Sequence, residues 1–395
     1  MPGALDDVTV VDFSQLVQGP LATQFLGDMG ADVIKIEAPG GEWMRQSWSM
    51  ANAYEDGVNL TFLTANRNKR SVELNIKDDE QLEVLYDVIA DADVFVENLR
   101  PGVVDRLGLG YDDLSEINPG IVYCSASGYG EEGPYTDRPG QDLIIQGVSG
   151  LATLNGRADD PPTPVGLPLN DFYSAAMLAF AAVSALYHRE QTGNGQHIKT
   201  DLLSASVHLQ SMEIDTYLNT GELPERSKTG ISHPYYQAPF GVYETADGHM
   251  TLSLTTPSVV GDALGIDSLE GYDSWETAYE HRDEIKPLIE DVLREEPTDY
   301  WIDKLVEHDI WGGPVQTMEE VVDDPQVGVN DMIRTVEHEE LGEIELTGVP
   351  FRMTKTPPDI HEAPPALGNA TEEVLREYGY CEAFIEELQM RNQDR

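Results

Sequence analysis

The chain has 395 residues, and its 72 Asp and Glu against 24 Lys and Arg give a formal net charge of −48. Such a charge argues against nucleic acid and anionic membranes as partners, because both are themselves negative. Hydrophobic residues make up 40% of the chain, which is enough for a folded core, and this length predicts two domains.

Acidic residues are spread along the sequence among apolar and aromatic residues, and Lys is scarce. This pattern is typical of a surface adapted to molar salt, where charges are screened within a few Å. We therefore expect a halophilic, cytoplasmic enzyme of haloarchaeal type. The first residues lack the features of a signal peptide, and the most apolar helical stretch, Met177 to Tyr187, is too short to cross a bilayer. Cys124 and Cys381 have no metal-ligand spacing, so no metal is expected.

The first half of the chain alternates between strands and helices. Strands are predicted at 8–12, 32–36, 71–74, 94–96, 121–124 and 197–200, and helices at 20–29, 78–90, 171–187 and 202–218. This alternation predicts an α/β fold with a parallel sheet covered on both faces. Ligands of such sheets bind beyond the carboxyl ends of the strands. The segments that begin at Gln18, Pro39, Asn98 and Ser125 each follow a strand and are the candidate site loops.

A second unit is indicated further along the chain. Residues 219–239 lose periodicity and contain several Gly and Pro, which is typical of a linker. Residues 240–254 then read as a hairpin with Asp247-Gly248 at its turn. The segment Gly108-Leu109-Gly110 lacks the third glycine of a dinucleotide fingerprint, so an NAD site is not expected.

Arg67, Lys69 and Arg70 form a basic cluster in a chain that otherwise avoids positive charge. Phosphate groups bind Lys and Arg through charge-assisted hydrogen bonds, so the cluster favours an anion site. The alternative is a basic turn that is paired with nearby carboxylates.

Several segments, in this order, resemble the class III CoA-transferase family, also called the formyl-CoA or carnitine-CoA transferase type. They are Asp12-Phe13 with Gly19-Pro20, Gly30 to Glu37, Asn68 to Ser71, Ala92 to Gly102, Ser127 to Pro134, Thr192 to Gln196, and Gly313 to Val315 with Asp324-Pro325. The resemblance implies a large doubly wound, Rossmann-like domain built from residues 1–200 and 313–395. It also implies a linker at 201–224, a smaller α+β domain at 225–312, and an interlocked homodimer.

The resemblance further implies transfer of CoA from an acyl-CoA to a free carboxylic acid through aspartyl anhydride and aspartyl-CoA thioester intermediates. The matching position for the nucleophile is Asp171. CoA and its thioesters would then be substrates, and no permanently bound cofactor is implied. The alternative role of Asp171 is that of a helix N-cap. As a nucleophile at a helix start, its carboxylate is expected to be kept ionised by backbone N–H groups and the helix dipole.

Contacts with CoA carry over from the family to six positions, which are Val17, Gln18, Lys69, Asn98, Leu99 and Arg106. Lys69 and Arg106 would meet the phosphates, whereas Asn98 and Leu99 would meet the pantetheine arm. Pairing with a neighbouring carboxylate is the alternative for Arg106. Ala38 stands where some members of the family carry an Arg that stacks on adenine.

Gln141 separates two reactions of the family fold. Acyl-CoA racemases place a His at this position as an acid/base group, and Gln cannot exchange a proton at neutral pH. Transferase activity is therefore favoured over racemase or epimerase activity, and an inactive CoA-ester binding protein is the alternative of another class. Residues 230–239 contain no glycine run, so oxalate–formate exchange is not expected.

Succinyl-CoA is the guessed donor and mesaconate, or a similar dicarboxylate, the guessed acceptor. Possible residues of the substrate pocket are Arg45, Arg138, Gln141, Asp142, His233 and Tyr235.

Overall fold

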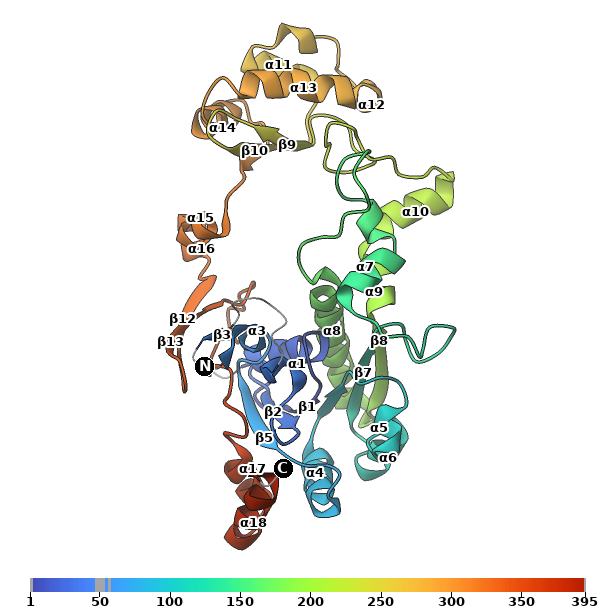
Figure 1. The fold of residues 1–395 in the computed structure, drawn as a ribbon, viewed down its shortest axis with the longest axis vertical. Helices are drawn as coiled ribbons and strands as arrows, with labels where there is room; N and C mark the ends of the chain where they lie inside the picture. The colour runs from blue at the N-terminus through green and yellow to red at the C-terminus, as the bar shows by residue number, and fades with distance from the viewer. Residues whose placement is uncertain (1–2, 47–53, 56–57, 394–395) are drawn as a thin grey trace. The chain divides into compact units, whose positions relative to one another are not determined.

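The computed structural model describes residues 3–46, 54–55 and 58–393. The chain divides into two compact units, which are drawn in Figure 1. Unit 1 comprises Met1–Ile145, Pro168–Ser206 and Pro325–Arg395, and unit 2 comprises Gln146–Leu167 and Val207–Asp324. Both ends of the chain therefore belong to unit 1.

Unit 1 is built on a six-stranded sheet whose neighbouring strands are all parallel. The strands are β1 (Thr9–Phe13), β2 (Asp32–Glu37), β5 (Lys69–Glu73), β6 (Val94–Glu97), β7 (Val122–Ser127) and β8 (Gln196–Asp201), in the spatial order β5-β2-β1-β6-β7-β8. The predicted parallel sheet is confirmed. Its order reverses direction between β1 and β6, which defines a topological switch point at the carboxyl edge.

Helices cover both faces of this sheet. On one face, α1 (Gln18–Asp28) and α8 (Leu169–Thr192) share a core with the strands through small residues of α8 such as Ala175 and Ala182. On the other face lie α4 (Asp79–Asp91) and, from the far end of the sequence, α17 (Thr371–Glu377) and α18 (Glu382–Gln393). The strands are almost wholly buried, because both faces of the sheet are covered.

Helix α8 is longer than the apolar stretch seen in the sequence. It has 24 residues, and by length and composition alone it could cross a membrane, which corrects the expectation that this segment is too short. A core helix of a soluble protein passes the same test. Of its most apolar 18-residue window, 44% is buried, and that buried face packs against α1 and the sheet.

Shorter elements of unit 1 border its sheet or lie beyond it. They are α2 (Trp43–Gln46), β3 (Tyr54–Glu55), β4 (Val58–Asn59), α3 (Leu60–Leu63), α5 (Val103–Arg106), α6 (Tyr111–Ile117), α16 (Pro325–Val329), and the hairpin of β12 (Ile333–His338) and β13 (Gly342–Thr347). Helix α7 (Asp142–Val148) begins in unit 1 and ends in unit 2.

Unit 2 has a core of its own between a three-stranded antiparallel sheet and four helices. The elements are β9 (Gly241–Glu244), β10 (His249–Leu252), β11 (Gly312–Pro314), α11 (Pro257–Leu264), α12 (Trp275–Glu280), α13 (Arg282–Leu293) and α14 (Thr298–Glu307). Strands β9 and β10 form the predicted hairpin. Its turn is fixed by Asp247, which accepts a hydrogen bond from the backbone N–H of Thr298 at 2.8 Å.

Several boundaries differ from the sequence-based ones. The helix predicted at 202–218 is two helices, α9 (Leu202–Leu209) and α10 (Ser211–Thr220), because the backbone leaves the helical region at Gln210 (φ −94°, ψ 21°). Unit 2 contains the predicted small domain, 225–312, and also residues 146–167, 207–224 and 313–324, which the prediction assigned to the large domain and its linker. Residues 146–167 join unit 2 through the Arg226 guanidinium, which donates hydrogen bonds to backbone carbonyls within them, and through the backbone N–H of Ala158, which donates to the Ser227 carbonyl.

Candidate active site

Two loops meet at the switch point of the sheet in unit 1. The backbone N–H of Gln15, after β1, donates to Asn98 Oδ1 at 2.8 Å, and Asn98 Nδ2, after β6, donates to the Gln15 carbonyl at 2.7 Å. This reciprocal pair holds the loop that carries Val17 and Gln18 beside the loop that carries Leu99. Four of the six predicted CoA contacts therefore lie together, at the edge where doubly wound sheets bind ligands.

The chain approaches itself closely in the first of these loops. A Cβ on Gly19 would lie 2.4 Å from the Ser14 Cβ and 3.4 Å from the Asn98 Cγ, so only glycine fits there without a shift of the backbone. The close approach brings the first turn of α1 against the loop that follows β6.

Asp171 lies in the first turn of α8, partly exposed. Helix α8 lies in the connection from β7 to β8. A helix in such a connection runs antiparallel to its strands, so the N-terminus of α8 lies at the carboxyl edge of the sheet. A direct contact joins it to the switch point. Gln18 Nε2 donates to Ser174 Oγ at 2.6 Å, one helical turn beyond Asp171.

Asp142, the first residue of α7, caps the start of α8. Its Oδ2 accepts hydrogen bonds from the backbone N–H groups of Asn170 at 2.6 Å and Asp171 at 3.4 Å. Burial, together with the negative charge of Asp142, raises the pKa of Asp171 to about 7. The expectation that the helix start keeps Asp171 ionised is therefore wrong, because a second carboxylate already occupies the N–H groups that would have lowered its pKa.

The basic cluster is paired within unit 1. Arg67 forms two hydrogen bonds with Asp28 at 2.7 and 2.9 Å, and Arg70 forms two with Asp32 at 2.5 and 2.9 Å. Lys69 is buried and donates to Asp12 Oδ2 at 2.9 Å. The structure thus has the basic turn paired with carboxylates, which was the alternative to an anion site.

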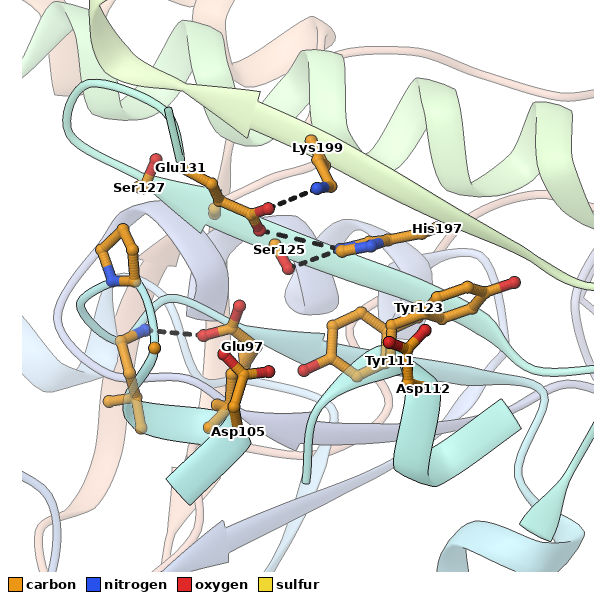
Figure 2. A pocket seen from close by; sticks show the side chains of 15 residues that line it. Glu97, Asp105, Tyr111, Asp112, Tyr123, Ser125, Ser127, Glu131, His197 and Lys199 are labelled. Atoms are coloured by element: carbon orange, nitrogen blue, oxygen red, sulfur yellow. Dashed lines mark hydrogen bonds and ion pairs between the residues drawn. The ribbon is translucent and has the colours of Figure 1, made fainter. Parts of the chain in front are cut away.

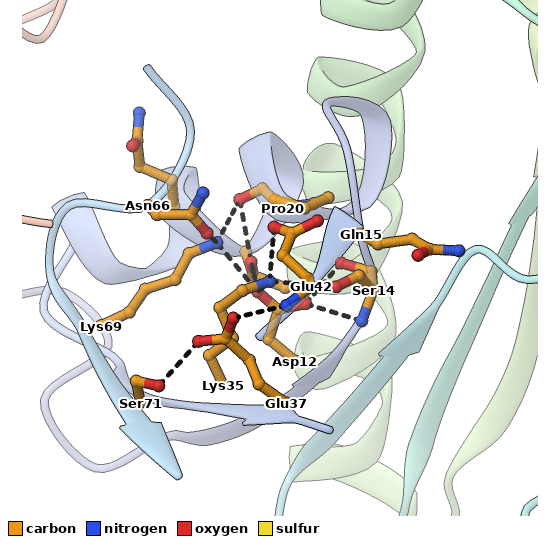
Figure 3. A network of polar contacts seen from close by, with 12 residues as sticks. Asp12, Ser14, Gln15, Pro20, Lys35, Glu37, Glu42, Asn66, Lys69 and Ser71 are labelled. Atoms are coloured by element: carbon orange, nitrogen blue, oxygen red, sulfur yellow. Dashed lines mark hydrogen bonds and ion pairs between the residues drawn. The ribbon is translucent and has the colours of Figure 1, made fainter. Parts of the chain in front are cut away.

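Lys69 belongs to a buried polar network between β1, β2 and β5 (Figure 3). Arg45 joins the same network through Glu37. Arg45 donates two hydrogen bonds to Glu37, both at 2.7 Å, and stacks 3.8 Å from the centre of the Phe62 ring. Its guanidinium is therefore held by the protein itself. Nothing in this geometry supports the predicted role of Arg45 in a substrate pocket or of Lys69 at the phosphates.

The remaining cations near this edge are exposed. Arg106, the last residue of α5, has no ion pair among the residues that the structure describes, so its guanidinium is available to a phosphate. Arg138 stacks on the Tyr135 ring at 4.0 Å. Gln141 is exposed and directly precedes α7.

His233 and Tyr235 lie in unit 2 and make contacts there. His233 Nε2 lies 2.6 Å from a carboxylate oxygen of Glu213, and the Tyr235 hydroxyl donates to the carbonyl of Glu222 at 2.9 Å. These contacts pack the segment that precedes β9, which was the alternative to a substrate contact.

Sequence reasoning missed a pocket of about 340 Å³ that lies over one face of β6, β7 and β8 and is lined by Tyr123 and His197 near the starts of β7 and β8 (Figure 2). Burial raises the pKa of Glu97 to about 7, and the nearby charges of Glu131 and Asp105 also oppose its ionisation. His197 Nε2 lies 2.8 Å from Ser125 Oγ. The carboxylates make this pocket unsuited to a pyrophosphate. No group of three or more potential ligands that could hold a metal ion is present in the described ranges of the chain.

Comparison with known proteins gives a consistent result. Residues 5–371 match the sequence profile described as CoA-transferase family III. An acyl-CoA transferase of Fusarium pseudograminearum is 34% identical over 391 residues, covering 95% of this chain and 85% of that protein. A succinyl-CoA:mesaconate CoA-transferase of Haloarcula hispanica is 33% identical over 387 residues, covering 95% and 97%. A CAIB/BAIF family protein from Brucella suis has a similar structure, with a TM-score of 0.85 and 29% identity over 96% of this chain and 100% of that chain.

Proposed function

We propose, since this chain belongs to CoA-transferase family III, that it transfers CoA from succinyl-CoA to a free dicarboxylic acid through covalent intermediates on Asp171. The broader statement follows from the family and its named relatives: the chain is an acyl-CoA:carboxylate CoA-transferase. The donor, the acceptor and the nucleophile are the proposal.

The proposed chemistry uses the Asp171 carboxylate twice. In the donor half, it attacks the thioester carbonyl and expels CoA thiolate, which leaves a mixed anhydride of succinate and Asp171. The thiolate then attacks the aspartyl carbonyl, releases succinate and forms an aspartyl-CoA thioester. The acceptor carboxylate reverses these two steps, which yields its own CoA ester and the free aspartate. Covalent catalysis of this kind divides one difficult exchange into easier steps.

One observation carries the assignment of Asp171. It is a partly exposed carboxylate at the carboxyl edge of the sheet, joined through the Ser174–Gln18 hydrogen bond to the loop at the switch point. A pKa near 7 leaves a large fraction ionised at neutral pH, and a carboxylate in a poorly solvated site is a stronger nucleophile than one in water.

The choice of acids rests on the relatives. Proteins named succinyl-CoA:mesaconate, succinyl-CoA:glutarate and succinyl-CoA–D-citramalate CoA-transferases are 31–33% identical to this chain. Their shared donor supports succinyl-CoA, and their acceptors are all dicarboxylic acids. Mesaconate is the first acceptor to test. Both relatives from Haloarcula are named for this acceptor, and the acidic composition of this chain indicates adaptation to salt.

We further propose that the working form is an interlocked homodimer. Helix α8 presents Phe172, Phe180 and Tyr187 on one face, spaced by eight and seven residues, and the last two are 69% and 71% exposed. A chain with so many acidic residues has little reason to leave large aromatic side chains in water. A second copy of the chain would cover this face. We also propose, from the acidic composition, that the protein works in a cytoplasmic, halophilic setting.

The test is an exchange assay in near-saturated KCl. The protein is mixed with succinyl-CoA and single free acids (mesaconate, itaconate, citramalate, glutarate, malate), and new CoA esters are identified by mass. Asp171→Asn should abolish every new ester. The matched control is Asp299→Asn, which changes an exposed Asp in the first turn of α14 and should leave the rate unchanged.

A second readout addresses the intermediate directly. With succinyl-CoA and no acceptor, the peptide that contains Asp171 should gain the mass of CoA less one water. A new ester formed at wild-type rate by Asp171→Asn would overturn the assignment. If no ester forms but the α-proton of an acyl-CoA exchanges with deuterium, the activity is that of a racemase instead.

A further inference from the structure

Residues 14–20, called the β1–α1 loop below, run from the end of β1 through the first three residues of α1 and carry Val17 and Gln18 at the switch point. Within this loop Leu16 has φ of +68°, a left-handed conformation that residues other than glycine rarely adopt. Such a conformation persists only where the surrounding structure enforces it. The groups that hold the loop therefore decide where Val17 and Gln18 lie.

Two buried lysines hold the two ends of this loop (Figure 3). Lys35 Nζ, from β2, donates to the carbonyl oxygen of Ser14 at 3.0 Å, and Lys69 Nζ, from β5, donates to the carbonyl oxygen of Pro20 at 2.7 Å. Their side chains are 0% and 1% exposed. Both ammonium groups thus act on backbone atoms of the loop from beneath it.

Asp12 links the two lysines. Its Oδ2 lies 2.9 Å from Lys69 Nζ and 3.7 Å from Lys35 Nζ, and its Oδ1 accepts the backbone N–H of Ser14 at 3.0 Å. Burial opposes the ionisation of Asp12, but the two ammonium groups outweigh it and hold the pKa of Asp12 well below its ordinary value. A buried charge of this kind is stable only while its partners remain in place.

The donors of Lys69 are fully used. Besides Asp12 and Pro20, its ammonium donates to Asn66 Oδ1 at 2.9 Å. An ammonium has three N–H donors, so none is left for an external phosphate. Turning the side chain outward would remove this donor from Asp12 and from the Pro20 carbonyl. Both keep a hydrogen bond from Thr23 Oγ1, but the buried Asp12 carboxylate would lose the nearer of its two ammonium partners.

We propose that Lys69 is a positioning residue, which fixes the β1–α1 loop against Asn98 and Leu99, where the pantetheine arm of CoA is expected, and that it is not a ligand of the CoA phosphates. This rests on the proposed transferase function. This role differs from the anion site that the sequence indicates for the basic cluster. The ammonium group of Lys69 binds buried groups of the protein itself.

The experiment compares succinyl-CoA with succinyl-pantetheine, which has the same thioester but no phosphate. In Lys69→Met, kcat/KM should fall at least tenfold for both donors and by the same factor, because the loop that meets their shared arm is displaced. If Lys69 instead bound the CoA phosphates, Lys69→Met would lower kcat/KM for succinyl-CoA alone. That selective loss, or an unchanged kcat/KM on both donors, would overturn the proposal.

Two further variants separate positioning from mere stability. Arg67→Met removes a neighbouring buried ion pair, with Asp28, and should lower the unfolding temperature without changing kcat/KM at temperatures where the protein is folded. If Lys69→Met does not fold, the double variant Asp12→Asn with Lys69→Met removes the buried charges as a pair and still deletes the hydrogen bond to Pro20. It should show the same equal loss on both donors.

Amide hydrogen exchange gives a readout that does not need activity. Exchange in a peptide that covers residues 14–20 should be at least tenfold faster in Lys69→Met than in wild type, and unchanged in Arg67→Met. If wild type proves to have no transferase activity, the proposed function fails while this comparison still decides whether Lys69 holds the loop. Unchanged exchange in Lys69→Met would overturn the positioning role.

Discussion

The carboxylate of Asp142 accepts the backbone N–H of Asp171 at 3.4 Å, and its negative charge opposes the ionisation of that same residue. One side chain therefore both caps the helix that carries the proposed nucleophile and adjusts its pKa. In the described part of the chain, Asp142 is the charged group that raises the pKa of Asp171 in addition to burial.

Asp142→Asn should separate these two effects. Asn still caps a helix, but it removes the like charge, so the ionised form of Asp171 becomes easier to form and its pKa falls. Wild-type kcat/KM should rise with pH to a plateau, with an apparent pKa of about 7. In Asp142→Asn the same curve should shift toward lower pH by roughly one unit, as measured in a pH series of the exchange rate.

Two neighbouring variants are the controls for that shift. Asp142→Glu keeps the charge and should keep the wild-type pH curve, whereas Asp142→Ala should shift the curve and also lose about 1 kcal/mol of stability with the cap. A pH curve of Asp142→Asn that coincides with that of wild type would show that Asp142 has no electrostatic effect on catalysis.

The raised pKa of Asp171 also has a consequence for stability. The folded state binds this proton more tightly than the unfolded state, whose Asp has a pKa near 3.8. The favourable contribution of the protonated group is thus fully present below pH 3.8, and it is lost as the pH rises through about 7. Wild type therefore carries an unfavourable buried charge at pH 8.

Asp171→Asn should remove that cost and stabilise the inactive protein. At pH 8 the gain should be on the order of 2 kcal/mol after allowance for solvent screening, or roughly 5 °C in unfolding temperature. The gain should shrink as the pH falls from 7 toward 4. Thermal unfolding of both proteins at pH 8 and pH 5 measures it, and an equal gain at both pH values would contradict the raised pKa.

The sequence predicted the sheet well because periodicity and alternation are local signals. All six predicted strands exist, and their order along the chain already implied parallel pairing. The predicted strand ends also placed the loops that begin at Gln18 and Asn98 at the carboxyl edge, and the structure joins these loops through Gln15 and Asn98.

What the sequence did not predict depends on partners distant in the chain. The sequence predicts Lys69 as a phosphate ligand, because it does not show that Lys69 meets Asp12 of β1, 57 residues earlier. The pKa of Asp171 likewise depends on Asp142, 29 residues earlier. Residues 146–167 join unit 2 through contacts with Arg226, Ser227 and Gln210. In each case the missing information was which distant residue a group meets.

Gly19 should not tolerate a side chain, because its position links β1, α1 and the loop after β6. Gly19→Ala places a methyl group 2.4 Å from the Ser14 Cβ, so the loop must move and the affinity for succinyl-CoA should fall at least tenfold. The matched control is Gly147→Ala in α7, where nothing lies within 4 Å of the added Cβ and helix propensity predicts a gain of up to about 1 kcal/mol. Titration with succinyl-CoA, followed by calorimetry, tests both; equal affinities in the two variants would contradict the close approach.

The net charge of −48 predicts that the protein needs salt to remain folded. Repulsion among surface carboxylates opposes the compact state, and KCl reduces it because the Debye length falls from about 10 Å at 0.1 M to about 3 Å at 1 M. The unfolding temperature should therefore rise by on the order of 10 °C between 0.1 and 1 M KCl, and more slowly at higher concentration, where screening is already nearly complete.

Sucrose separates screening from a general strengthening of burial. As an excluded, uncharged solute it favours the compact state without affecting charge repulsion, so at equal osmolality it should raise the unfolding temperature less steeply than KCl does below 1 M. Above 1 M the two slopes should converge, since only preferential exclusion and stronger burial of apolar surface remain. An unfolding temperature that falls as KCl is added would show that the acidic surface is not an adaptation to salt.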